Sequence, residues 1–340
     1  MSILLVIVGI SALIFAHELG HFLSAKLFGV KVEEFGFGFP PRLASKKIGE
    51  TRYSINLLPF GGFVRLSGEN LLAPVSEQEK PRSFSYQPVW RRIIIIVSGV
   101  AMNFLLGWFI ISGLFVFGVS EPVGITMVFP DAPAAKAGLK EGDRIAGFGK
   151  AEEFVNFVNE NKGKEIVLNI KRGEENLKIK IMPRLQAPEG QGALGIGVGE
   201  LGFVKLPLLA SLKEGFFTAA QTVWMIFIAL MNLIVGVFTG TMAFENFVGP
   251  VGIFQVAAQA GEFGFSYLFS LIGMISLNLM VLNILPFPAL DGGRLLFVLV
   301  EKIKGSPLPA KAEAYINAAG FVFLLLLMIA ITVKDVIYLF

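Results

Sequence analysis

The sequence His17-Glu18-Leu19-Gly20-His21 lies inside an apolar run that begins near the N-terminus of the chain. Residues four apart lie on one face of a helix, so the two imidazoles can bind the same Zn²⁺ ion. Glu18 lies between them, where a carboxylate can take a proton from zinc-bound water. The chain has only these two histidines. The alternative is a pair of polar residues hydrogen-bonded inside a helix bundle, but ionisable groups within a membrane are costly and usually functional, which favours a metal site.

A third ligand is needed, because catalytic zinc normally binds three protein side chains. No further histidine and no cysteine is present, so the third ligand must be a carboxylate. The candidate is Asp291, in Asn283-Ile-Leu-Pro-Phe-Pro-Ala-Leu-Asp-Gly-Gly293, which closes a long apolar run. The two prolines interrupt helical geometry there, and the two glycines allow tight turns. The alternative is that Asp291 caps a helix that begins near Arg294.

The composition is that of an integral membrane protein. Of the 340 residues, 54% are hydrophobic and 16% are charged, and the mean hydropathy is +0.69, whereas about 25% of a soluble domain is charged. The net charge of +3 is weak evidence for nucleic acid, because basic residues in a membrane protein mark cytoplasmic loops. The absence of cysteine excludes disulfides and thiol catalysis. We therefore expect contact with the lipid bilayer and no nucleic acid.

Four segments are long and apolar enough to cross a bilayer, which takes about 20 residues. They are residues 2–27, 93–119, 265–290 and 316–335. The first lacks a basic start and a small-residue cleavage site, so we interpret it as a retained transmembrane helix and not as a signal peptide. A fifth apolar stretch, about 215–240, is ambiguous, and residues 121–185 have the charge density of a soluble domain.

The distribution of lysine and arginine predicts the orientation. Residues 29–92 and their flank are rich in both, which places this loop on the cytoplasmic side; the residues are Lys26, Lys31, Arg42, Lys46, Lys47, Arg52, Arg65, Lys80, Arg82, Arg91 and Arg92. The N-terminus and residues 121–185 then lie outside. If 215–240 crossed once, Asp291 would reach the wrong face to join the histidines. We therefore predict that 215–240 lies at the interface or re-enters without crossing.

An ordered set of motifs covers most of the chain and resembles the site-2 protease family, in particular its bacterial regulator of sigma-E protease group. The motifs are His17-Glu-Leu-Gly-His21, Gly36-Phe-Gly-Phe-Pro40, Leu58-Pro-Phe-Gly-Gly-Phe-Val-Arg-Leu66, the Arg91-Arg92 run leading to Asn103, Gly249-Pro-Val-Gly252, and Asn283 through Gly293. The resemblance implies that His17, His21 and Asp291 bind zinc and that Glu18 is the general base.

The resemblance also implies residues that shape the substrate site. These are Asn283, Pro286 and Pro288. Asn283 can donate a hydrogen bond to a developing oxyanion, and its alternative role is hydrogen bonding between helices. Cofactors other than zinc are not suggested by any motif.

Residues 31–66 are the candidate for holding the substrate. A transmembrane substrate must be unwound locally before it is cut, and unpaired backbone in lipid costs several kcal/mol. Family members have a membrane-associated β-hairpin here, whose edge strand can pair with an extended substrate. The partly alternating sequence Arg52–Leu58 suggests the strand, and Gly61-Gly62 a turn; the candidate substrate-binding residues are Ile55, Asn56, Leu57 and Leu58. The alternative is an ordinary cytoplasmic loop.

Residues 121–185 resemble a PDZ domain. Strands are predicted at 124–128, 165–171 and 177–183, and an amphipathic helix at 152–161. PDZ grooves accept an added peptide strand, so this domain is expected to bind a substrate peptide or terminus. The alternative is a spacer whose groove is closed.

Together these observations predict a polytopic α-helical membrane protein with about four transmembrane helices, a membrane-associated β-hairpin and one extracytoplasmic PDZ-like α+β domain. The predicted regions are an N-terminal transmembrane region at 1–120, the PDZ domain at 121–185, a linker with an interfacial or re-entrant helix at 186–264, and a C-terminal transmembrane region at 265–340.

The predicted function is hydrolysis of peptide bonds within transmembrane segments of single-pass membrane proteins, such as anti-sigma factors or signal-peptide remnants, in a bacterial inner membrane. Two alternatives stay open. A catalytically silent PDZ-bearing adaptor would need none of the four site residues. A metal transporter would need more titratable groups along its spans than the sequence contains.

Overall fold

The fold was obtained as a computed structural model, which describes residues 2–70, 72–118, 123–173, 175–188, 190–200, 202–240, 249–262 and 265–339. The chain divides into two compact units. The first comprises residues 1–110, 217–258 and 271–340, and the second comprises residues 111–216 and 259–270. Each unit is described by itself below.

Within the described ranges, five helices are long and apolar enough to cross a membrane, as expected for a multi-pass membrane protein. They are α1 (Ser2–Leu27), α2 (Val89–Phe117), α5 (Leu208–Thr239), α7 (Phe265–Ile284) and α9 (Ala310–Leu339). The four predicted spans fall in α1, α2, α7 and α9. The third is shorter than expected and ends at Ile284, because Pro286 and Pro288 cannot continue the helix.

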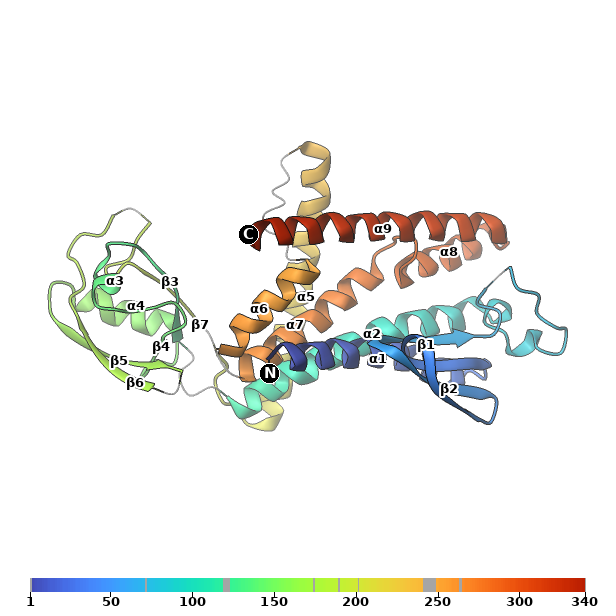
Figure 1. Cartoon of the computed structure of the whole chain (residues 1–340), viewed down its shortest axis with the longest axis horizontal. Coiled ribbons are helices and arrows are strands. Elements are labelled where there is room, and N and C mark those ends of the chain that lie inside the picture. Colours follow the sequence, from blue (N-terminus) through green and yellow to red (C-terminus); the bar gives the residue numbers. More distant parts are fainter. Residues whose placement is uncertain are drawn as a thin grey trace. The chain divides into compact units, whose positions relative to one another are not determined.

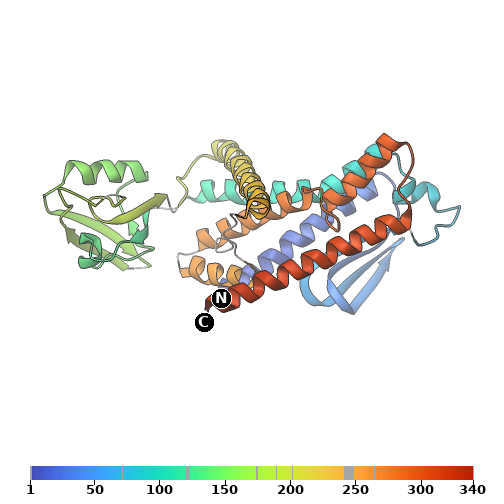
Figure 2. The same cartoon turned by 90° about the horizontal axis from the view of Figure 1, so that it is seen from above.

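Helix α5 covers the ambiguous stretch 215–240. It is one continuous helix of 32 residues, so its length and composition suffice for a span. Within the first unit, however, its residues 217–239 run across the direction shared by α1, α7 and α9: α5 stands upright in Figure 1 and is foreshortened in Figure 2. A helix that crosses its neighbours in this way fits a position along the membrane interface, which stays a prediction.

The β region 31–66 forms two long strands, β1 (Val32–Ile48) and β2 (Thr51–Leu66). Each strand bends back on itself. Residues 34–37 of β1 pair with 62–65 of β2 in antiparallel order, so that residue 34 lies opposite residue 65. The same residues also lie beside 52–55 in parallel order, with residue 34 opposite residue 52 and residue 37 opposite residue 55. Residues 44–48 of β1 then pair with 51–55. The sheet therefore has four strips in the order 58–66, 32–39, 51–56 and 42–48, and the first and last strips are its edges.

This sheet packs against α1 through a small apolar core. The core residues are Ala25, Val30, Val32, Leu66 and Ile95. The ring of Phe35 lies 5.1 Å from that of Phe15 and 4.8 Å from that of Phe22, both on α1. Burial of aromatic rings in such tilted contacts fixes the sheet to the helix that carries the two histidines. Gly61, at φ 93°, marks a bend within β2 and not a chain reversal.

The second unit contains a five-stranded antiparallel sheet in the order β6-β5-β4-β3-β7. Its strands are β3 (Val123–Val128), β4 (Arg144–Ile145), β5 (Ile166–Arg172), β6 (Glu175–Ile181) and β7 (Ile196–Glu200). Two helices, α3 (Pro133–Lys136) and α4 (Ala151–Glu160), complete it. The strands and helix expected from sequence are present. Strand β7 lies beyond the predicted range 121–185 and pairs with β3, so the folded sheet extends to residue 200.

The remaining helices connect these elements. Helix α6 (Pro250–Glu262) precedes α7, and the amphipathic α8 (Asp291–Lys304) joins α7 to α9. Two short turns of 3₁₀-helix, η1 (Lys80–Arg82) and η2 (Phe84–Tyr86), lie between β2 and α2. Helix α8 ends at Gly305, whose φ of 78° is the left-handed conformation that commonly closes a helix.

Candidate metal centre

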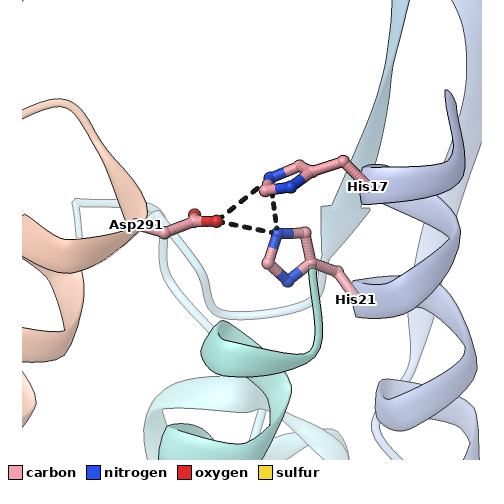
Figure 3. A group of neighbouring side chains, drawn as sticks. All are labelled: His17, His21 and Asp291. Atoms are coloured by element: carbon pink, nitrogen blue, oxygen red, sulfur yellow. Dashed lines mark hydrogen bonds and ion pairs between the residues drawn. The ribbon is translucent and has the colours of Figure 1, made fainter. Parts of the chain in front are cut away.

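Three side chains capable of binding a metal meet in the first unit. His17 and His21 project from α1, and Asp291 projects toward them from the start of α8 (Figure 3). Oδ2 of Asp291 lies 3.0 Å from Nε2 of His17 and 3.1 Å from Nε2 of His21, and the two Nε2 atoms are 3.2 Å apart. Ligands about 2.0–2.1 Å from a tetrahedral zinc ion lie roughly 3.3 Å from one another, so these three atoms fit zinc. In the described ranges this is the one such group.

Helix α2 packs directly against the histidine face of α1. The approach is close because both helices carry small residues there, as is common between membrane helices. A Cβ on Gly20 would lie 2.4 Å from the carbonyl oxygen of Ser98, and a Cβ on Gly99 would lie 2.3 Å from Nε2 of His21. Oγ of Ser98 also donates to the carbonyl oxygen of Gly20 at 2.9 Å. Gly20 therefore allows the backbone of α2 to approach α1, and Gly99 leaves room for the imidazole of His21.

The second nitrogen of each imidazole faces α2. Nδ1 of His21 donates to the carbonyl oxygen of Ile95 at 2.7 Å, which directs Nε2 to the cluster. Nδ1 of His17 lies 3.3 Å from the amide nitrogen of Asn103. Such outer contacts orient metal-binding histidines and set their tautomer.

A tight turn after α7 delivers Asp291. The N–H of Phe287 donates to the carbonyl oxygen of Leu285 at 2.7 Å, and Ala289 has a φ of 73°. A Cβ on Gly292 would lie 2.0 Å from the carbonyl oxygen of Leu285, so only glycine fits at this close approach. The N-cap of α8 is Leu290, and the carboxylate of Asp291 faces the histidines instead of capping the helix.

Glu18 lies in the same cavity as the three ligand candidates. The cavity has a volume of about 440 Å³ and is bordered by α1, α2, the α7–α8 turn and the 62–66 strip of β2. Oε2 of Glu18 accepts a hydrogen bond from the N–H of Val64 at 3.0 Å. The sheet thus holds the carboxylate beside the histidines.

The other candidate residues divide into two groups. Asn283 lines the cavity, whereas Pro286 and Pro288 do not and belong to the turn that places Asp291. Pro288 packs against Gly320 of α9, where a Cβ would lie 2.5 Å away. The prolines therefore act on the site through the backbone.

Residues 55–58 do not border the cavity. Asn56 is 4% exposed and its amide donates to the carbonyl oxygens of Phe37 and Gly38. Ile55 pairs with Phe37 on one side and Ala44 on the other, so its backbone is engaged on both edges. Leu57 and Leu58 are exposed. The physical reason is the bend in each strand, which places 51–56 inside the sheet.

Two charged residues at the cavity were not singled out from the sequence. Arg294 lies one turn after Asp291 on α8 and borders the cavity together with Glu69 from the loop after β2. Their side chains form an ion pair. The signal for Arg294 was its spacing from Asp291, since residues three apart share a helix face. Glu69 carried no comparable signal, because its partner is 225 residues away.

Comparison with known proteins agrees with this geometry. Residues 5–327 match the profile of peptidase family M50. A protein of Clostridium perfringens named as a zinc metalloprotease is 36% identical over 344 positions, which cover 99% of each chain. The regulator of sigma-W protease RasP of Bacillus subtilis is 30% identical over 423 positions, which cover all of this chain and 99% of that protein.

The zinc metalloprotease RasP of Bacillus licheniformis is also similar. It is 31% identical over 415 positions, which cover 96% of this chain and 97% of that protein. The match to the family profile and these relatives extend over nearly the whole chain. The chain therefore belongs to peptidase family M50, and it is a zinc metalloprotease.

Proposed function

We propose that this chain hydrolyses peptide bonds within the transmembrane segments of single-pass membrane proteins, using zinc bound by His17, His21 and Asp291. One observation carries the proposal: a single cavity beside an apolar helix of transmembrane length is lined by all three ligand candidates and Glu18. Bound zinc supplies a Lewis acid and makes water nucleophilic near neutral pH.

Glu18 is the proposed general base. It stands between the two histidines, and the N–H of Val64 fixes one of its oxygens. From there the carboxylate can take a proton from the attacking water and later give it to the leaving amine. Asn283, also at the cavity, is placed to donate a hydrogen bond to the negative oxygen that forms at the scissile carbonyl.

The outer strip of β2, residues 62–66, is the proposed platform for the unwound substrate. It is an edge of the sheet, because among the described residues these pair only with the 32–37 strip, and it borders the cavity. An added strand along this edge would replace the hydrogen bonds that a substrate helix loses on unwinding. Of the four residues first proposed for this role, Ile55 and Asn56 lie in the inner strip, and Leu58 lies at the start of the outer one.

The proposed topology places the N-terminus and the sheet domain of the second unit outside a bacterial plasma membrane and residues 29–92 on the cytoplasmic side. Within the first unit, the N-terminus of α1 and the C-terminal end of α9 lie at the same end, opposite to β1, β2 and α8 (Figure 1). Two termini on one face require an even number of crossings, which supports four spans with α5 at the interface.

This arrangement and the name of the sigma-W relative support a proposal about the substrates. We propose single-pass proteins that have lost their outer domain, such as anti-sigma factors or signal-peptide remnants, with release of a cytoplasmic fragment as the signal. The PDZ-like domain of the second unit would bind or filter the outer end of the substrate. This sequence of events is regulated intramembrane proteolysis.

The test is co-expression with a tagged single-pass reporter whose outer domain has been removed. Glu18→Gln is compared with wild type, and Glu77→Gln, on an 85% exposed side chain, is the matched control. The amide oxygen of the introduced glutamine can still accept from Val64, so only the base is lost. We expect cleavage within the transmembrane segment by wild type and control, and a decrease of about 10²–10⁴-fold for Glu18→Gln. Equal cleavage by all three proteins would contradict the role of Glu18.

A further inference from the structure

A histidine that binds zinc through Nε2 carries its proton on Nδ1, and this N–H needs an acceptor. For His21 the backbone provides it, because Nδ1 lies 2.7 Å from the carbonyl oxygen of Ile95. A carbonyl oxygen can only accept. The contact therefore keeps the proton on Nδ1 and leaves the lone pair of Nε2 facing Asp291.

His17 faces a side chain of α2 at the corresponding position. Its Nδ1 lies 3.3 Å from the amide nitrogen of Asn103. Asn103 is 0% exposed, and its Oδ1 has no hydrogen-bond partner among the described residues. A buried amide oxygen without a partner costs about 1–3 kcal/mol. The unpartnered Oδ1 and the nitrogen that contacts His17 belong to the same carboxamide, so the orientation of that group bears on both observations.

The two ends of a carboxamide have nearly the same shape and opposite hydrogen-bonding roles. With the nitrogen toward His17, Asn103 donates to Nδ1, and the imidazole proton must sit on Nε2, the atom that a metal needs. A rotation of 180° about the Cβ–Cγ bond brings Oδ1 to the same place. The oxygen then accepts from Nδ1–H, and the lone pair of Nε2 points to the atoms of Asp291 and His21.

We propose that Asn103 is a positioning residue of the metal centre: its Oδ1 accepts the Nδ1–H of His17 and so selects the tautomer that binds zinc. The inference rests on the proposed function, in which His17 is a ligand. Helix α2 then holds both histidines, one through a main-chain carbonyl and the other through a side chain. Oγ of Ser276 on α7 donates to the carbonyl oxygen of Asn103 at 2.7 Å and ties this turn of α2 to α7.

Three variants separate this role from packing. Asn103→Leu has nearly the same size and removes both polar atoms. Asn103→Asp provides a stronger acceptor, since carboxylates are common partners of zinc-bound histidines. Ser276→Ala is the matched control, because it removes a buried hydrogen bond from α7 to the main chain of Asn103 and leaves the contact between the Asn103 side chain and His17 in place. Each full-length protein is purified in detergent, and zinc retention is titrated against a chelator.

We expect Asn103→Leu to weaken zinc binding by about 10–100-fold, Asn103→Asp to bind zinc at least as tightly as wild type, and Ser276→Ala to bind zinc as wild type does. If Asn103 had only a packing role, Asn103→Asp would bind zinc more weakly than wild type, because an added buried charge destabilises the fold. Weaker binding by Asn103→Asp than by wild type, or unchanged binding by Asn103→Leu, overturns the inference. If Asn103→Leu does not fold, Asn103→Asp decides alone.

The same zinc titration of His17→Ala tests the metal site separately from the role of Asn103. Loss of zinc in His17→Ala together with unchanged binding in Asn103→Leu would overturn the role of Asn103 and leave the metal site standing. Unchanged zinc binding in His17→Ala would show that the proposed metal site itself is wrong.

Discussion

Replacement of Gly99 by alanine tests how closely α2 must approach the metal centre. The added Cβ would lie 2.3 Å from Nε2 and 2.5 Å from Cε1 of His21. Ordinary contacts of a Cβ begin at 3.4 Å, so the imidazole would have to move by about 1.1 Å (3.4 minus 2.3). The ring cannot turn freely, because its Nδ1 is held 2.7 Å from the carbonyl oxygen of Ile95. A shift of about 1 Å in catalytic geometry typically costs about 10²-fold in rate.

We therefore expect Gly99→Ala to lower the kcat/KM for reporter cleavage by about 100-fold and to weaken zinc retention. Gly113→Ala is the control. Gly113 lies on the same helix, and a Cβ there meets nothing within 4 Å in the described structure. Both substitutions gain the same helix propensity, about 1 kcal/mol, so their difference isolates the clash with His21. Cleavage and zinc retention at wild-type levels in Gly99→Ala would refute this account of the α1–α2 approach.

Two further predictions concern charges on the side of the protein that carries β1, β2 and α8. Arg92 donates two hydrogen bonds to Glu301, at 2.8 and 2.6 Å, so Arg92→Leu should lower the free energy of unfolding by about 2–4 kcal/mol by leaving that carboxylate unpaired. The double variant with Glu301→Leu should recover most of this loss in denaturant titrations; no recovery would contradict the pairing. Hydrogen bonds from Arg82 and Lys26 lower the pKa of Glu50 to about 2. The stabilisation by Glu50 is therefore complete above its unfolded pKa of about 4.3 and is lost as the pH falls toward 2. In Glu50→Gln the unfolding temperature should decrease less over this pH range than in wild type. An equal decrease in both proteins would contradict the stabilisation of Glu50 by Arg82 and Lys26.

The ligand candidates could be predicted from sequence because the information is local. The two histidines lie one helical turn apart, and the composition leaves only a carboxylate for the third position. The Pro and Gly residues around Asp291 indicated a turn, and the structure has one there. What brings Asp291 to α1 is packing over 270 residues of sequence, which the resemblance to a family supplied and the spacing alone did not.

The position of the proposed substrate platform could not be predicted from the sequence. Alternation in residues 52–58 correctly indicated a strand, but alternation does not say which neighbours a strand has. Because β1 and β2 both bend, residues 52–55 are paired on two sides and the edge falls at 62–66. Likewise, the short run Ile196–Glu200 carries two glycines and little strand propensity, so its place beside β3 was not apparent. The position of the sheet edge at 62–66 and the place of β7 are both set by strand pairing in the folded protein and not by the local sequence.

The central claim is that His17, His21 and Asp291 bind one zinc ion, beside which Glu18 acts as the general base. The most direct measurement is the zinc content of the purified full-length protein after dialysis against a weak chelator, for wild type, Asp291→Ala and Glu18→Gln. The account predicts about one zinc per chain in wild type and Glu18→Gln, and loss of zinc in Asp291→Ala. Full retention of zinc by Asp291→Ala would contradict the account, because the carboxylate that meets both histidines would then not be a ligand.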